Sequence, residues 1–146
     1  MARSTRTFTV AASIDRVEAF LADPTHAADW DVTVASIVPD AADPSAWDLV
    51  VAFYGKRIPF RLVRHAVAPG LVEHRGTHAH ARLTERFELA ACPDGGTAVT
   101  YVAEVRLTGA FRLRNKGLDS AFAAVKAKSA TRLAAALDEH ASTNGR

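Results

Sequence analysis

The sequence predicts an α+β fold in which a curved antiparallel β-sheet of six to seven strands wraps around one long C-terminal α-helix. Two short helices are expected after the first strand. Most segments between Val32 and Thr108 alternate apolar and polar residues, which is the period of a half-buried strand. From Leu118 to Ala141 the apolar residues recur every three or four positions, alanine is abundant, and glycine and proline are absent.

The first strand is predicted at Thr5–Val10, where threonines alternate with apolar side chains. Ser13 is a suitable N-cap for the helix that follows, and Asp23-Pro24 ends this helix. Because proline suits the first position of a helix, a second short helix is expected at Pro24–Asp29, directly before Trp30.

The remaining strands are separated by turn signals, of which Pro69-Gly70 and the run Pro93-Asp94-Gly95-Gly96 are the strongest. Residues Gly76–His80 favour neither strand nor turn. The predicted strands are Val32–Val38, Trp47–Phe53, Lys56–Val67, Leu71–Arg75, Ala81–Ala91 and Thr97–Thr108.

The long helix carries one stripe of mostly apolar residues, of which Phe122, Val125 and Leu133 are expected to face the sheet. Lys126 is expected to lie off this stripe. Only this helix is long enough to cover the apolar face of the sheet. Since a strongly bent sheet cannot close perfectly on one helix, a cavity is expected between them. The full stripe is Leu118, Phe122, Val125, Ser129, Leu133, Ala136 and His140, and Ser142–Arg146 are expected to be frayed.

Composition bounds the class of protein. The 146 residues are expected to form a single domain, with 49% hydrophobic and 23% charged residues. Cys92 is the only cysteine, so no internal disulfide can form, and a reducing, cytoplasmic location is expected. No apolar run is long enough to span a membrane, and no apolar stretch follows the basic N-terminus. A net charge of +2 does not favour nucleic acid, and both a monomer and a homodimer remain open.

Several loose motifs resemble one superfamily. Phe8–Leu21 is similar to its first strand and helix start, although Ser13 stands where proline is usual. Asp23-Pro24 followed by Trp30, and the hairpin Gly95–Tyr101, also match. The chain therefore resembles the Bet v 1/START superfamily of helix-grip proteins (SRPBCC), which includes polyketide cyclases/dehydrases and lipid transport proteins. The resemblance implies a START/Bet v 1-like domain over residues 1–146, with a pocket for an apolar or aromatic molecule between sheet and helix.

Glu85 is the candidate catalytic residue. It lies between Leu83 and Phe87 on the face that alternation assigns to the interior. Desolvation there should raise its pKa, so it could act as an acid or a base. Alternatively, a bulge turns Glu85 outward, because a slip of one residue exchanges the faces of a strand, or an arginine pairs with it inside the cavity. His26, Tyr101 and Glu104 are weaker candidates for a second titratable group.

Six residues are candidate ligand contacts, because each carries an aromatic, imidazole or hydroxyl group near the expected cavity. Each has a structural alternative: Trp30 packs at the sheet edge, the Tyr101 hydroxyl pairs within the protein, and the Ser129 hydroxyl bonds to its own helix. The candidates are His26, Trp30, Phe53, Tyr101, Phe122 and Ser129.

Three histidines, His74, His78 and His80, could suggest a metal site. A zinc site needs a third aligned ligand, and Gly76 interrupts this strand, so we expect solvent-facing histidines and no metal or other cofactor. The basic segment Arg112–Lys116 is expected to be a solvated face.

The leading functional hypothesis is binding or transport of a hydrophobic small molecule, lipid-like or aromatic, in the cavity between sheet and helix. The alternative is a polyketide cyclase or dehydratase that uses acids and bases in the pocket, which would need at least two titratable groups within reach of one substrate. A third hypothesis is an interaction module of a larger assembly, which predicts a small or filled cavity.

Overall fold

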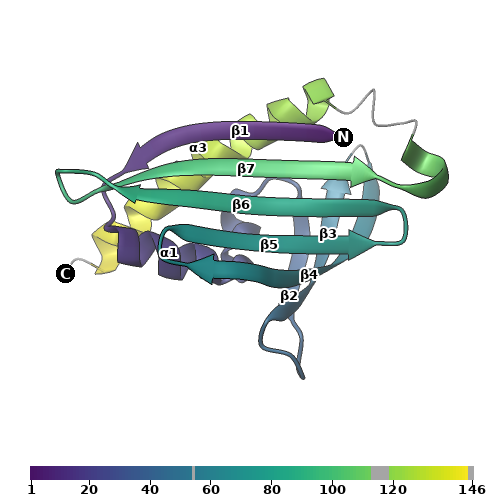
Figure 1. Cartoon of the computed structure of the whole chain (residues 1–146), viewed down its shortest axis with the longest axis horizontal. Coiled ribbons are helices and arrows are strands. Elements are labelled where there is room, and N and C mark those ends of the chain that lie inside the picture. Colours follow the sequence, from purple (N-terminus) through teal and green to yellow (C-terminus); the bar gives the residue numbers. More distant parts are fainter. Residues whose placement is uncertain (54, 113–118, 145–146) are drawn as a thin grey trace.

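The computed structural model describes residues 1–53, 55–112 and 119–144, and contains one sheet of seven antiparallel strands. Their order across the sheet is β1-β7-β6-β5-β4-β3-β2 (Figure 1). The strands are β1 (Ala2–Val10), β2 (Val34–Pro39), β3 (Ala46–Phe53), β4 (Lys56–Ala68), β5 (Leu71–His78), β6 (Ala81–Ala91) and β7 (Thr97–Leu107). The helices are α1 (Ile14–Ala22), the 3-10 helix η1 (Pro24–His26), α2 (Ala27–Trp30) and α3 (Asp119–Asn144).

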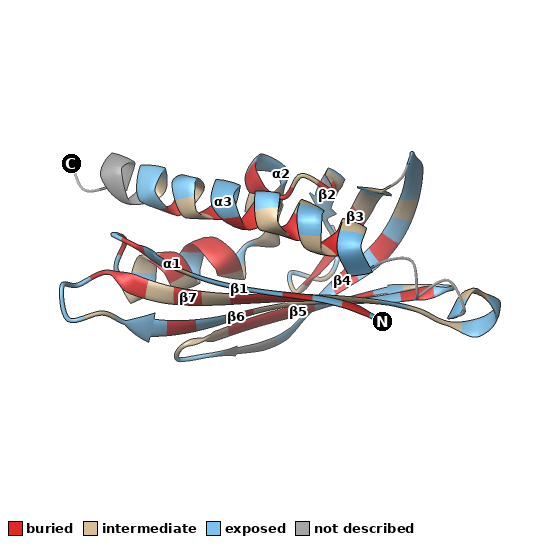
Figure 2. Ribbon diagram, turned by 90° about the horizontal axis from the view of Figure 1, so that it is seen from above, coloured by how far each residue is buried: buried red, intermediate tan, exposed pale blue. Residues whose placement is uncertain are grey.

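The connection from β1 to β2 crosses the full width of the sheet, because these two strands are its opposite edges. Its helices start where the sequence predicts. Ser13 precedes α1 in extended conformation, and the Asp23 carboxylate accepts a hydrogen bond from the Thr25 amide at the start of η1. As a result α1, α2 and α3 all lie on the same side of the sheet (Figure 2).

The sheet curls at its β2 end toward α3, and the apolar side chains of its inner face form two clusters. One cluster lies beneath α1 and α3 and includes Val72, Phe87 and Leu133. The second belongs to the curled part and includes Trp47 and Phe60. Both α3 and the crossing helices are therefore needed to cover this face. None of the helices in the described residues is long and apolar enough to cross a membrane.

Three strand boundaries differ from prediction by two residues or more. β1 begins at Ala2 rather than Thr5, because it pairs with β7 from Ala2 onward. β5 continues past Arg75 to His78, because Gly76 pairs with Leu83 on β6 and the ladder extends to the turn. A Cβ at Gly76 would stand 3.3 Å from carbons of Leu83 and Phe60, so glycine lets these two side chains meet over the strand. β2 begins at Val34 rather than Val32, because the backbone between α2 and β2 forms a turn around a buried carboxylate, described below.

The buried face of α3 also differs from prediction. Phe122, Ser129 and Leu133 are buried as expected, but Val125 is only half-buried. Lys126, expected to lie off the stripe, is buried, and so is Leu137. The helix runs to Asn144, past the predicted end at Ala141, and residues 145–146 lie outside the described part of the chain.

Candidate ligand-binding site

A cavity of about 440 Å³ lies between the inner face of the sheet and the first half of α3. Its volume is within the range of pockets that enclose small molecules, which is about 300–1,000 Å³. The cavity forms where β3 and β4 curl away from the central strands, so that α3 does not fill the space. Its apolar lining includes Leu49, Val51, Ile58, Phe60, Leu83, Val105, Leu107 and Phe122.

One end of the cavity is lined by exposed polar residues. Lys56 and Arg57 begin β4, and His80 lies in the turn between β5 and β6. The imidazole of His80 packs against the ring of Phe111, with centroids 4.7 Å apart, and His78 packs near Phe60 at 5.9 Å. This end is therefore basic and aromatic, and is the mouth of the cavity.

The opposite end holds a buried ammonium group between two carboxylates. Nζ of Lys126 on α3 donates a hydrogen bond of 3.0 Å to Oδ2 of Asp31, which directly follows α2. It donates another, also of 3.0 Å, to Oε1 of Glu85 on β6. The Lys126 side chain is only 3% exposed. Three elements distant in sequence thus meet at one charged centre.

Asp31 is held by its own neighbours as well. Its Oδ1 accepts hydrogen bonds from the Thr33 amide at 2.9 Å and the Thr33 hydroxyl at 2.7 Å. The Ser129 hydroxyl donates to the same oxygen at 3.3 Å and accepts from the Val32 amide at 3.1 Å. These bonds turn the chain between α2 and β2 around the Asp31 carboxylate and attach it to α3.

The three charged groups respond differently to burial. Burial raises the pKa of Asp31, but the charge of Lys126 and the bonds from Thr33 outweigh it, so the pKa lies below its usual range. Burial raises the pKa of Glu85, and Lys126 only partly offsets this, so the pKa stays raised. Burial acts to lower the pKa of Lys126, but the two carboxylates prevail and raise it. Lys126 and Asp31 are therefore a stable ion pair, and Glu85 is the group able to exchange a proton.

Tyr101 lies beside Glu85. Burial and then the charge of Glu85 raise the pKa of Tyr101 well above its usual range. The geometry falls short of a hydrogen bond, and neither the Tyr101 hydroxyl nor Oε2 of Glu85 has a hydrogen-bond partner among the described residues. A proton on Oε2 of Glu85 could be donated to the Tyr101 hydroxyl, so that both atoms would have a hydrogen-bond partner. This agrees with the raised pKa of Glu85.

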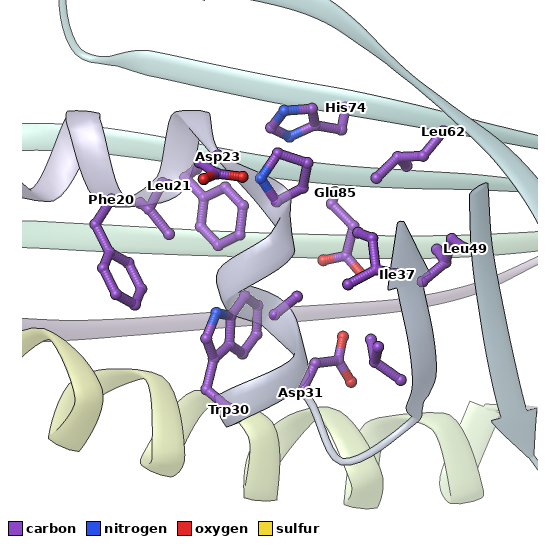
Figure 3. A pocket seen from close by; sticks show the side chains of 14 residues that line it. Phe20, Leu21, Asp23, Trp30, Asp31, Ile37, Leu49, Leu62, His74 and Glu85 are labelled. Carbon is purple, nitrogen blue, oxygen red and sulfur yellow. The ribbon is translucent and has the colours of Figure 1, made fainter. Parts of the chain in front are cut away.

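A second, smaller cavity of about 40 Å³ lies between the crossing helices and the sheet (Figure 3). His74 and Glu85, which are directly opposite each other on β5 and β6, border it on the sheet, and Trp30 and Asp31 border it from below. Burial of His74, and then the nearby charge of Arg64, lower its pKa to about 4. His74 is therefore neutral near pH 7.

The structure places the predicted ligand contacts in three settings. Phe53 and Phe122 line the large cavity. Trp30 lines the small one and packs edge-to-face on Phe87 and Tyr101.

The other three predicted contacts line neither cavity. His26 stacks on Phe20 with centroids 4.3 Å apart, and Tyr101 is enclosed beside Glu85. The Ser129 hydroxyl neither bonds to its own helix nor faces the cavity, which are the two expected positions; instead it bonds to the turn after α2.

The prediction of solvent-facing histidines needs correction at His74. His74 is buried rather than solvent-facing, because β5 lies inside the sheet and its even-numbered residues point inward. No three His, Cys, Asp or Glu side chains in the described residues are grouped to hold a metal. Glu104 lies on the outer face, 3.3 Å from Arg3. In the basic segment Arg112–Lys116, residues 113–116 lie outside the described part of the chain.

Lys126 and Asp31 are the site residues that sequence reasoning misses. Lys126 lies four residues after Phe122 and three before Ser129, so helical spacing alone places it on the buried stripe. Residue type argues against this position, because lysine is rarely buried without a partner. Asp31, next to the predicted pocket residue Trp30, gives no comparable signal.

The fold has relatives among solved structures. A START superfamily protein from Mycobacterium smegmatis is 15% identical, with 98% of this chain and 99% of that chain covered and a TM-score of 0.70. The Zhui aromatase/cyclase from Streptomyces sp. R1128 is 16% identical over 99% of this chain and 95% of that chain, with a TM-score of 0.74. A protein from Thermus thermophilus is 14% identical over 99% of both chains, with a TM-score of 0.73. These likenesses show a shared fold.

No curated protein sequence matches the chain. A protein-family model described as polyketide cyclase/dehydrase and lipid transport matches residues 1–138. The match includes every strand of the sheet and most of α3, and so both walls of the large cavity. The chain therefore belongs to the polyketide cyclase/dehydrase and lipid transport family.

Proposed function

We propose that this protein binds a hydrophobic small molecule, aromatic or lipid-like, in the large cavity between the sheet and α3. The observation that carries the proposal is the cavity itself, with its volume of about 440 Å³ and its mainly apolar walls. An apolar pocket with one polar group to orient the ligand is the usual form of a small-molecule site. An interaction module without a ligand would not need such a space.

The test is a fluorescence titration with a neutral apolar probe, N-phenyl-1-naphthylamine, which should show one saturable site. Ile58→Trp should weaken probe binding at least tenfold, because Ile58 on β4 lines the cavity and tryptophan would fill it. Val63→Trp is the matched control, since Val63 lies on the same strand but is exposed on the outer face. Non-saturable binding, or equal loss in both variants, would contradict the proposal.

A second candidate function is an aromatase/cyclase-type reaction. The observation that favours it is that Glu85, whose pKa is raised, borders the cavity beside Lys126. A buried acid of this kind could donate a proton to a carbonyl or hydroxyl oxygen during ring closure or loss of water. Three of the relatives in solved structures are described as aromatase/cyclases: Zhui and the di-domain proteins StfQ and BexL.

This candidate is tested with a linear poly-β-ketone thioester as substrate. The wild-type protein should accelerate formation of the cyclised aromatic product, and Glu85→Gln should abolish the acceleration while still binding the apolar probe. Glu88→Gln, on the outer face of the same strand, should leave both unchanged. Equal product formation with and without protein would leave binding as the function.

A further inference from the structure

We propose that the buried end of the cavity selects an uncharged ligand that presents a hydrogen-bond donor, such as a phenol or alcohol, to Glu85, and that it excludes carboxylates. This inference rests on the proposed binding function and adds the chemical class of the ligand. Two properties of the buried end support this preference. One is the set of polar atoms that can still accept or donate a hydrogen bond, and the other is the net charge of these groups.

Glu85 is the polar side chain that the buried end offers to a ligand. Oδ1 of Asp31 accepts bonds from Thr33 and Ser129, Oδ2 accepts one from Lys126, and the Asp31 side chain is only 5% exposed. The Thr33 hydroxyl donates its hydrogen to Asp31. The Lys126 ammonium is enclosed between the two carboxylates. Glu85, by contrast, lines the cavity and keeps 13% of its side chain accessible.

The free capacity of Glu85 at Oε1 is for accepting hydrogen bonds, because Lys126 already donates to this oxygen and a proton on Glu85 would lie on Oε2. Its Oε1 accepts one bond, from Lys126, and a carboxyl oxygen has two lone pairs. A ligand hydroxyl can therefore donate to the same oxygen without displacing Lys126. An ether of the same shape offers only lone pairs, so the second lone pair of Oε1 would have no donor in an apolar cavity. The penalty for an unmade bond at a buried polar group favours the hydroxyl.

The charges at this end also oppose an anion. One ammonium faces two carboxyl groups, so the centre is neutral when Glu85 is protonated and carries one negative charge when Glu85 is ionised. Neither state has a positive charge to spare for a ligand carboxylate. Lys56 and Arg57 are exposed at the mouth, so a ligand whose carboxylate faced them would bring no hydrogen-bond donor to Oε1 of Glu85.

The experiment compares three ligands of one shape by isothermal titration calorimetry near neutral pH: 4-phenylphenol, 4-methoxybiphenyl and biphenyl-4-carboxylate. The phenol should bind at least about tenfold more tightly than the ether, as expected when the ether leaves a buried acceptor without a donor. It should also bind at least about tenfold more tightly than the carboxylate. Equal binding of phenol and ether, or binding of the carboxylate as tight as that of the phenol, would overturn the inference.

Two variants assign the preference to Glu85. Glu85→Leu keeps the Lys126–Asp31 pair and should reduce the phenol-to-ether ratio to within about twofold, while the ether still binds. Glu85→Gln keeps the side-chain shape and should narrow the gap between phenol and carboxylate, because it removes a negative charge. Glu88→Gln should leave all three affinities unchanged. A phenol preference that survives in Glu85→Leu would refute the role of Glu85.

The two proposals fail in different ways. If none of the three ligands and no neutral probe binds saturably, the binding function itself is wrong and the inference falls with it. If the ether binds at one site but the phenol shows no advantage, the cavity binds hydrophobic molecules and only the inference is wrong.

Discussion

Nζ of Lys126 lies 3.0 Å from Oε1 of Glu85, which joins the helix to the central sheet at the buried end of the cavity. Asp31 completes the centre from the opposite side of the ammonium. Two acidic groups share one base, so the centre leaves one carboxyl group, Glu85, with a raised pKa. The same pair therefore contributes both to the stability of the fold and to the chemistry of the cavity.

Lys126→Met should lower the free energy of unfolding by about 3–5 kcal/mol, because removal of one partner leaves uncompensated buried charge. Urea unfolding monitored by circular dichroism measures the change. Lys128→Met is the control, since Lys128 is exposed two residues further along α3. If the two variants are equally stable, the buried ammonium does not hold the helix to the sheet.

Glu85 should make stability depend on pH. Its folded pKa lies above the ordinary value of 4.5, so the native state binds more protons than the unfolded chain as pH rises above that value. The contribution of Glu85 is fully present below the ordinary value and is lost as pH rises through the folded pKa. Relative to Glu85→Gln, the wild-type protein should therefore lose stability as pH rises.

The measurement is the difference in unfolding free energy between wild type and Glu85→Gln over a series of pH values. Asp31, Lys126 and Tyr101 are present in both proteins, so their own titration cancels to first order. Glu88→Gln should follow the wild type throughout. If the wild-type protein instead gains stability relative to Glu85→Gln as pH rises, Lys126 depresses the pKa of Glu85 and Glu85 is an ordinary ion-pair partner.

His74 should make the stability of the fold depend on pH in the opposite direction, so that stability is lost as pH falls. Its pKa falls from 6.5 to about 4 on folding, so the unfolded chain binds more protons below the ordinary value. The contribution of neutral His74 is present above pH 6.5 and is lost as pH falls toward 4. The full effect is roughly 3 kcal/mol, since one pKa unit corresponds to about 1.4 kcal/mol.

NMR titration of the His74 ring would measure this pKa directly, and His74→Gln should flatten the acid side of the stability profile. His78→Gln serves for comparison, because His78 is half-buried at the end of the same strand. A His74 pKa near 6.5 would show that water reaches the small cavity beside it.

Phe122→Ala should destabilise the protein by about 3–5 kcal/mol, the usual range for truncation of a buried phenylalanine. Phe122 is buried on α3 and also lines the large cavity, so the variant enlarges that cavity. Val125→Ala should have a smaller effect, because Val125 is only half-buried. Thermal unfolding of both variants tests which face of α3 packs on the sheet. A larger loss of stability in Val125→Ala than in Phe122→Ala would mean that another face of the helix packs there.

Much of the fold is predictable because its signals are local. β6 occupies Ala81–Ala91 as predicted, since eleven alternating residues end at a strong hairpin signal that begins at Pro93. The inward orientation of Glu85 follows from the same alternation. The long helix, and a cavity between it and the bent sheet, also follow from pattern and geometry.

The charged centre cannot be predicted in the same way, because its partners come from distant parts of the chain. Asp31 and Lys126 are 95 residues apart, and Lys126 and Glu85 are 41 apart. Helical spacing permits Lys126 on the buried face, but burial of an ammonium is favourable only if carboxylates arrive to pair with it. Local patterns are enough to define the strands, the helices and the inward face of Glu85. The burial of Lys126, the bond from Ser129 to the turn at Asp31, and the choice of polar group that faces the cavity all require the folded chain, because each depends on pairing between elements that meet only there.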